Sequence, residues 1–336
     1  MHPSIAAMAL LLQVAAAPPI HAQAAAAQSA GRTAASSLAP SEIVAAAPGS
    51  DWTPIAAADL LVMTLAPDSH HHARRVVIQL MPPPFSQGWV GNIRKLAAAH
   101  WWDGLSVNRV QDNYVAQWGD AGADDKAKAR ALPAGLAVVP EVEYSMPPGD
   151  LEPLVKSWIE HDTVGSALPK HLGVVNDVYA GFSTDWKGWP VGSDLARVWP
   201  VHCYGMVGVG RDLSPNTGSG AELYTVIGHA PRHLDRNIAL VGRVIEGIEH
   251  LSSLSRGTEA LGFYKTAAER TPIVSIRLGN AVADLPRYEY LSTESASFAK
   301  YADARANRRD AFFIRPAGGA DICNIPVPVR RVKVAG

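Results

Sequence analysis

Apolar residues gather along this chain in short runs, and the spacing within each run predicts its secondary structure. In the first half, aliphatic and β-branched residues predict strands over residues 60–65, 76–80, 105–110 and 114–117. Between the second and third of these strands, Val90, Ile93 and Ala97 recur at the spacing of one helix face. We therefore expect a helix over residues 87–100.

The second half of the chain repeats this mixture of strands and helices. Apolar and β-branched residues predict strands over residues 205–209, 223–227, 238–244 and 274–278. We expect a short helix over 245–254, a longer one over 293–312, and an extended segment over 325–329. This order of elements predicts an antiparallel β-barrel or sandwich that carries two helices.

Residues 121–200 interrupt the pattern. Small and charged side chains at the start of this segment are followed by many Pro and Gly residues. We interpret the segment as a long insertion with little regular structure, apart from a short helix over 151–160. A loop of this length inside a compact domain is uncommon, and it usually has a function or packing of its own.

The N-terminal segment has the composition of a secretory signal peptide. Residues 5–17 are apolar apart from Gln13, which matches the core of a signal peptide and is too short to span a bilayer. We expect residues 1–22 to be removed on export and the protein to be periplasmic or secreted. The alternative is an uncleaved disordered tail, because no Lys or Arg precedes the apolar run.

The next segment, residues 23–50, consists mainly of Ala, Ser, Gln, Pro and Gly, and we predict a disordered linker. No later segment reaches 18 uninterrupted apolar residues, so no membrane span is expected after the signal is removed.

Composition excludes several classes of protein. The 336 residues are 48% hydrophobic, too apolar for a wholly disordered chain. Lys and Arg number 30 against 31 acidic residues, so net charge gives no reason to expect a nucleic acid or an anionic membrane as the partner. Two cysteines cannot build a disulfide-dense scaffold or a multi-cysteine zinc module. Cys203 and Cys323 either pair in an oxidising compartment or remain buried thiols.

Two blocks of sequence carry more specific information. The first reads DGLSVNRV over 103–110 and YVAQWGD over 114–120. The second reads GMVGV over 205–209, PNTGSGAELY over 215–224 and VGRVIEG over 241–247, with Leu234-Asp235 between the last two. Both blocks resemble the signature segments of cyclophilin-type peptidyl-prolyl cis/trans isomerases, in the order in which that family has them.

The resemblance covers roughly residues 74–120 and 201–280, and it implies a closed eight-stranded antiparallel barrel capped by two helices. The barrel domain would occupy residues 51–284, with the insertion 121–200 inside it. A helical and extended tail would follow over 285–336. The implied activity is isomerisation of X-Pro bonds in proline-containing segments of client proteins, without a cofactor or a metal ion.

The resemblance also assigns the site residues. Arg109 takes the position of the catalytic arginine of the family, and Gln117 takes that of the glutamine that holds the arginine and the substrate carbonyl. Four further residues take the positions that line the proline slot: Tyr114, Val115, Tyr224 and Leu234.

Elementary chemistry agrees with these residue types. An X-Pro bond isomerises slowly because amide resonance raises a barrier of about 18–20 kcal/mol. A catalyst needs an apolar slot for the proline ring and a fixed donor for the prolyl nitrogen, whose lone pair develops as the bond twists. A guanidinium suits this role because it keeps its protons at physiological pH.

Several positions depart from the family pattern. Val107-Asn108 replaces the usual Phe-His pair, Trp118 replaces a glycine, and Glu222 stands where a neutral amide is usual. His233 occupies the position of the family's Trp before Leu-Asp, and Ile238 occupies that of the slot's His. We expect Glu222 to pair with Arg109 or with another cation. The alternative function is therefore a catalytically weakened module that binds proline-containing peptides or a protein partner.

Overall fold

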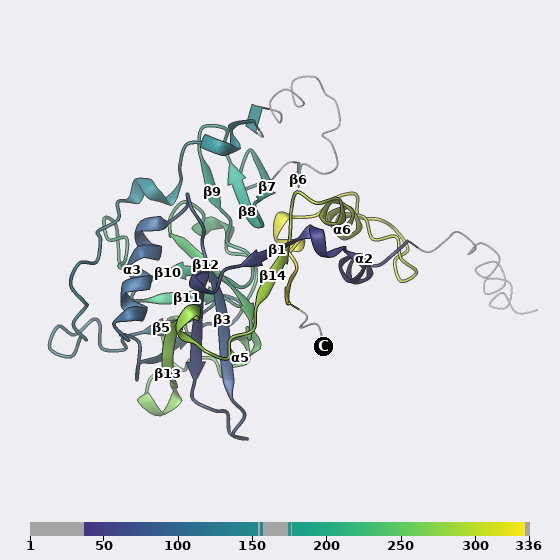
Figure 1. Cartoon of the computed structure of the whole chain (residues 1–336). Coiled ribbons are helices and arrows are strands. Elements are labelled where there is room, and N and C mark those ends of the chain that lie inside the picture. Colours follow the sequence, from purple (N-terminus) through teal and green to yellow (C-terminus); the bar gives the residue numbers. More distant parts are fainter. Residues whose placement is uncertain (1–36, 154, 157–173, 176, 333–336) are drawn as a thin grey trace, which may run out of the picture.

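The computed structural model describes residues 37–153, 155–156, 174–175 and 177–332. At its centre is a closed antiparallel barrel of eight strands in the order β10-β11-β5-β4-β13-β2-β3-β12 (Figure 1). The strands are β2 (Leu60–Leu65), β3 (Arg74–Leu80), β4 (Ser106–Val110), β5 (Val115–Gly119), β10 (Met206–Val209), β11 (Leu223–Val226), β12 (Leu240–Glu246) and β13 (Thr271–Leu278). The prediction of a closed eight-stranded barrel is confirmed.

The continuous apolar run of β3 is explained by burial on both of its faces. Val76 and Ile78 point into the main core, whereas Val77 packs on the other side against Ile55 and Tyr288. A strand that is covered on both faces carries apolar residues without alternation. The barrel wall is therefore covered locally by residues from the two ends of the chain.

Helix α3 (Gln87–Ala98) lies on one side of the barrel, as the apolar spacing predicted. Trp89, Ile93 and Leu96 are fully buried on its inner face. Helix α5 (Glu249–Ser252) is shorter than expected, because β12 runs on to Glu246 and the chain then turns at Gly247 with φ of 83°. A positive φ of this kind favours glycine and separates strand from helix.

The prediction of little regular structure in the insertion was wrong for its second half. That part forms a four-stranded antiparallel sheet of β6 (Val174–Val175), β7 (Phe182–Trp186), β8 (Trp189–Ser193) and β9 (Val198–Pro200). Lys187 and Gly188, both at positive φ, form the two-residue turn between β7 and β8. Such a turn matches the twist of a β-hairpin. The range 151–160, where a short helix was expected, lies partly outside the described residues.

The tip of this hairpin meets the barrel and the C-terminal segment at Arg243, which is buried. Arg243 donates from Nε to Gln79 Oε1 at 3.0 Å and from one terminal nitrogen to the Gly188 carbonyl at 2.7 Å. Its guanidinium also lies 4.5 Å from the ring centre of Trp189. A Cβ at position 188 would stand 2.5 Å from the Tyr290 ring, so Gly188 permits this close approach.

The two ends of the described chain pack together, which corrects the disordered linker expected over 23–50 for its described part, residues 37–50. Helix α2 (Pro40–Ala46) places Ile43 and Val44 against a cluster formed by Trp52, Leu291, Phe298, Tyr301 and Ile325. Glu42 Oε2 accepts a hydrogen bond from the Ala39 N–H at 2.7 Å and caps the first turn. An Ala-rich segment with an apolar pair can thus form a helix when a partner surface buries that pair.

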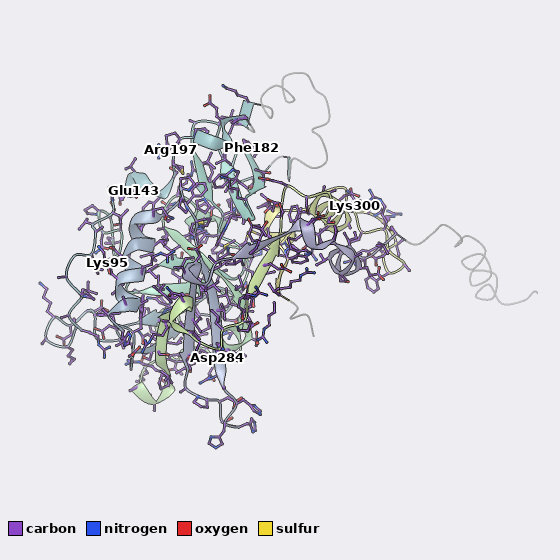
Figure 2. All side chains as sticks on the ribbon, viewed as in Figure 1. Lys95, Glu143, Phe182, Arg197, Asp284 and Lys300 are labelled. Carbon is purple, nitrogen blue, oxygen red and sulfur yellow. A yellow bond between two sulfur atoms is a disulfide. The ribbon has the colours of Figure 1, made fainter. Side chains whose placement is uncertain are left out.

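The partner surface is helix α6 (Ala296–Ala306), which lies beside α2 and away from α3; Lys300 marks it in Figure 2. Strand β1 (Trp52–Ile55) pairs with β14 (Tyr288–Leu291), which in turn pairs with β15 (Val329–Arg331). The expected helix of the tail is therefore present but shorter than 293–312, and of the extended segment expected over 325–329 only Val329 lies in a strand. The expected signal peptide, residues 1–22, lies outside the described residues.

Cys203 and Cys323 form a disulfide, with their Cα atoms 5.1 Å apart. Of the two alternatives left open by the sequence, the pair of free thiols is wrong. The bond ties the C-terminal tail to the segment that enters β10.

Candidate functional site

Three of the predicted site residues lie in one row across neighbouring strands. Arg109 on β4 is the Cα partner of Gln117 on β5, and Gln117 is the partner of Tyr224 on β11. Residues directly opposite each other in an antiparallel pair project from the same face. The register of the barrel therefore places these three residues together.

The row passes through a bulge that changes the register between Val107 and Arg109. The buried residue at this bulge is Asn108, whose Nδ2 donates to the Gly119 carbonyl at 3.0 Å and whose Oδ1 accepts from the Ser106 hydroxyl at 2.7 Å. Its side chain therefore joins β4 to β5 where the ladder is irregular. The Asn in the position of the family's His has this structural role.

The Arg109 guanidinium is held by three oxygen acceptors. Nε donates to the Leu261 carbonyl at 2.7 Å, one terminal nitrogen donates to Gln117 Oε1 at 3.2 Å, and the other donates to Gln111 Oε1. A guanidinium has five N–H donors. Within the described parts of the chain these contacts engage three of them, and each terminal nitrogen keeps a second N–H for another acceptor.

Two aromatic rings flank the same guanidinium. The central carbon of Arg109 lies 5.6 Å from the ring centre of Tyr114 and 5.4 Å from that of Phe263. Both distances fall in the range of cation–π attraction. The surroundings shift the pKa of Arg109 downward, chiefly through burial. The site thus holds a partly desolvated cation in a fixed place.

The four predicted slot residues form one apolar cluster beside this cation. Val115 and Tyr224 are buried in it, and Tyr114 and Leu234 pack against them as partly buried members. Two further members complete the cluster, namely Val226 and Ile238. All six predicted site residues are thus brought together by β4, β5, β11 and the segment after β11.

The hydroxyl of Tyr224 has a buried polar partner. Its oxygen lies 3.0 Å from His202 Nε2, and His202 Nδ1 lies 2.8 Å from Asp235 Oδ1. Burial, together with the neighbouring tyrosine and carboxylate, raises the pKa of Tyr224 well above 10. The ring therefore stays a neutral phenol while its far end is hydrogen-bonded.

Glu222 behaves differently from the expectation that it would pair with Arg109 or another cation. Its Oε1 accepts the Asp120 N–H at 2.6 Å, and its carboxylate also accepts a hydrogen bond from the Gln117 side chain. Burial raises its pKa to about 7. A Cβ at position 119 would stand 2.0 Å from Oε1, so Gly119 leaves the space for this carboxyl group.

Gln117 is consequently oriented from both sides. Its Oε1 accepts from Arg109, and its amide nitrogen is turned toward Glu222. The unusual carboxylate therefore supports the pairing of Gln117 with Arg109 instead of competing for the arginine.

Sequence reasoning missed four contributors to the site. Gln111 lies two residues after Arg109, and the two-residue period of a strand could have placed it on the same face. Val226 could have been found in the same way from Tyr224. His202 and Phe263 come from loops far away in the sequence, and no motif or spacing marks either of them.

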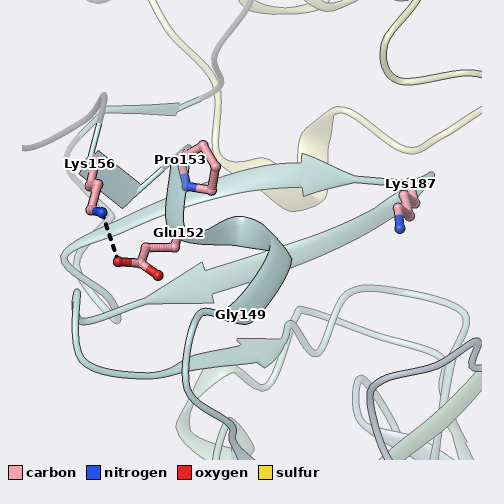
Figure 3. Close-up of a pocket in the computed structure, with 5 residues that line it drawn as sticks. All are labelled: Gly149, Glu152, Pro153, Lys156 and Lys187. Carbon is pink, nitrogen blue, oxygen red and sulfur yellow. Dashed lines mark ion pairs between the residues drawn. The ribbon is translucent and has the colours of Figure 1, made fainter.

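A separate pocket lies on the insertion, lined by Gly149, Glu152, Pro153, Lys156 and Lys187 (Figure 3). Glu152 and Lys156 form an ion pair at 2.9 Å across it. None of the six predicted site residues lines this pocket.

Among the described residues, no group of three or more His, Cys, Asp or Glu side chains could hold a metal ion. Across the same parts of the chain, no helix has both the length and the apolar character needed to cross a membrane.

Comparisons with known proteins agree with this fold. The family model described as "Cyclophilin type peptidyl-prolyl cis-trans isomerase/CLD" matches residues 75–278. No curated protein matches the chain.

Among solved structures, cyclophilin AquaCyp293 from Hirschia baltica has a TM-score of 0.55 at 19% sequence identity, over 84% of this chain and 95% of its own. A cyclophilin-type peptidyl-prolyl cis-trans isomerase from Cryptosporidium parvum has a TM-score of 0.36 at 10% identity, over 65% of this chain and 97% of its own. Since the family model matches more than half of the sequence and the barrel has the expected topology, this chain belongs to the cyclophilin-type peptidyl-prolyl cis-trans isomerase family.

Proposed function

We propose that this protein accelerates cis/trans isomerisation of X-Pro bonds in exported client proteins, with Arg109 as the catalytic donor. The observation that carries the proposal is the position of the Arg109 guanidinium, bonded to Gln117 and beside the apolar cluster that contains Tyr224. A cation that retains unused N–H groups next to an apolar surface fits a proline ring and its amide together.

In the proposed reaction the proline ring rests on the cluster of Tyr114, Val115, Tyr224 and Leu234. As the amide twists, resonance is lost and the prolyl nitrogen gains a lone pair. An unused N–H of Arg109 donates to that lone pair, and the contact is stronger in the twisted state than in either planar isomer. Such a contact lowers the barrier, because it binds the transition state more tightly than the substrate.

Gln117 has two tasks in this proposal. Its Oε1 fixes the guanidinium, and of the two N–H groups of its amide, one bonds to Glu222 and the other would donate to the carbonyl of the substrate. Preorganisation of this kind matters because donors that are already in place need no reorientation during the reaction.

Export is supported by two features. The sequence begins with a segment typical of a signal peptide, and Cys203 and Cys323 form a disulfide, a bond that persists in oxidising compartments. Slow X-Pro steps limit the folding of many proteins, so a periplasmic or secreted isomerase would act on chains that fold after export.

A peptide isomerisation assay tests the catalytic assignment. We expect Arg109→Ala to lower kcat/KM by about 100-fold or more, the loss typical of removing one preorganised donor. Arg94→Ala is the matched control, since Arg94 lies on α3 in a surface ion pair with Asp59, and it should retain nearly full activity.

Equal rates for the wild type and Arg109→Ala would overturn the catalytic role of Arg109. Binding of a proline peptide by a wild type that does not accelerate isomerisation would favour the alternative function, a binding module.

A further inference from the structure

Behind the apolar cluster, a chain of buried polar groups starts at the hydroxyl of Tyr224. It continues through His202 and Asp235 to Arg232, whose Nε donates to Asp235 Oδ2 at 2.7 Å. The side chains of His202, Asp235 and Arg232 are 1%, 3% and 2% exposed. The six assigned site residues include only the first member of this chain.

For a neutral imidazole, the partners assign the direction of each hydrogen bond. Asp235 Oδ1 accepts from the backbone N–H of His202 at 2.9 Å and lies 2.8 Å from Nδ1 of the same residue. A carboxylate that pairs with an arginine is an acceptor, so Nδ1 carries the proton. The other nitrogen, Nε2, is then the acceptor for the Tyr224 O–H. The two aromatic rings lie nearly parallel, with an angle of 12° between their planes.

Arg232 connects this chain to parts of the protein outside the barrel. It forms an ion pair at 2.8 Å with Asp177 of the insertion, and its guanidinium lies 5.1 Å from the ring centre of Tyr179. In the C-terminal tail, Asp321 lies 3.7 Å away. The disulfide to Cys323 begins at Cys203, the residue that follows His202.

A phenylalanine at position 224 would present the same apolar ring without requiring any polar partner. The tyrosine instead buries a hydroxyl, an imidazole, a carboxylate and a guanidinium, and buried polar groups of this kind are costly unless all of them are bonded. Gly208 leaves the room for this arrangement, since a Cβ there would stand 2.3 Å from the Tyr224 oxygen. The backbone of β11 holds one end of the ring, and His202 holds the other.

We propose that His202, oriented by Asp235 and Arg232, is a positioning residue that fixes the Tyr224 ring in the proline slot. Through Arg232, the insertion supports the same ring from outside the barrel. This inference rests on the proposed function, because it gives Tyr224 its role as a wall for the proline ring of the substrate.

The first test compares Tyr224→Phe, His202→Gln and the double variant in the peptide isomerisation assay. We expect each single variant to lower kcat/KM by about 3- to 10-fold, the range for one lost hydrogen bond. The double variant should lose no more kcat/KM than the less active of the two single variants, since both substitutions remove the same contact. Asp177→Asn should shift kcat/KM in the same direction by a smaller factor.

Tyr301→Phe is the matched control. It deletes another buried tyrosine hydroxyl, which donates to the Pro326 carbonyl at 2.7 Å in the tail cluster. It should lower the midpoint of thermal unfolding about as much as Tyr224→Phe does, and leave kcat/KM unchanged. Loss of kcat/KM by both tyrosine variants alike, or by neither, would overturn the positioning role.

Nitrogen NMR of His202 tests the hydrogen bond to Tyr224 without an activity assay. We expect Nδ1 to be protonated, Nε2 to be bare, and the Nε2 signal to move in Tyr224→Phe. Protonation at Nε2, or a signal that the tyrosine variant leaves unmoved, would overturn the positioning role. A wild type without isomerase activity would instead overturn the proposed function, while the NMR result still tests the hydrogen bond.

Discussion

The two sides of the proposed slot differ in how their charged groups are placed. On the Arg109 side, a partly exposed cation is held by Gln117, Gln111 and a backbone carbonyl, and in the proposed function its two remaining N–H groups would contact a substrate. On the Tyr224 side, the polar groups are buried and bonded to one another. The N–H groups on the Arg109 side would donate to a ligand, whereas the buried polar groups on the Tyr224 side keep an apolar wall in place. In the proposed function, charged groups therefore take part in the reaction on the Arg109 side and keep the apolar wall rigid on the Tyr224 side.

The largest expected effect separates these two uses of charge. Asp235→Ala leaves Arg232 as a buried cation with fewer partners, and we expect it to lower the free energy of unfolding by about 3–5 kcal/mol. Asp103→Ala breaks a pair with Arg277 whose side chains are 33% and 24% exposed, and it should cost only about 0–1 kcal/mol. Urea denaturation measures both values, and equal losses would contradict the comparison.

Removal of the disulfide comes next in size. Cys203 and Cys323 are 120 residues apart in the sequence, so their bond closes a long loop. Replacing both by Ser should lower the free energy of unfolding by about 2–4 kcal/mol. Thermal unfolding with and without reductant measures this, and the reduced wild type should match the double variant. A midpoint that reductant leaves unchanged would refute the expected contribution.

Glu222 allows a pH test on the Arg109 side. Its pKa is about 7 in the folded protein, raised above the ordinary value of 4.5. A folded-state pKa above the unfolded one means that the protonated form favours folding. The contribution is complete below about pH 4.5 and is lost as pH rises through about 7.

Glu222→Gln should therefore gain stability relative to the wild type between pH 5 and 8, by an amount on the order of 2–3 kcal/mol. Denaturant midpoints at several pH values give the difference between the two proteins. A difference that stays constant with pH would show that Glu222 does not titrate in this range.

The smallest effect concerns the aromatic flank of the cation. Phe263→Ala removes a ring at 5.4 Å from the Arg109 guanidinium and should lower kcat/KM by about 2- to 5-fold, as expected for a partly exposed cation–π contact. Phe313→Ala removes a similar contact to Arg308 in the tail, at 4.2 Å, and should leave catalysis unchanged. An identical response of the two variants would remove Phe263 from the site.

Strand period predicted an antiparallel barrel or sandwich, and the resemblance to cyclophilin motifs assigned Arg109, Gln117 and Tyr224 to one site, because both signals lie within short stretches of sequence. The insertion sheet was missed because both faces of β8 are buried, so its residues show no alternation of polar and apolar positions. The lysine and glycine at 187–188 were the available signal for a hairpin. Helix α2 was missed because its two apolar residues need the surface of α6, which lies some 250 residues further along the chain.

The role of His202 in the site could not be predicted for the same reason, since its contacts join segments that are far apart in the sequence. Its neighbours Tyr224, Asp235 and Cys323 come together only when β11, the segment after it and the tail have folded. No spacing within the sequence marks such a set, because each contact joins a different pair of segments.

The contacts of the buried Arg243 limit where this chain can be shortened. The guanidinium is enclosed by a barrel strand, the tip of the insertion hairpin and the aromatic residues Trp189 and Tyr290. Deleting the hairpin would remove the Gly188 carbonyl that accepts from the Arg243 guanidinium. Ending the chain after β13 would remove Tyr290, which covers the guanidinium on another side. A chain shortened in either way would contain a buried arginine that lacks part of its partners. Residue 243 would therefore have to be replaced before either truncation is made.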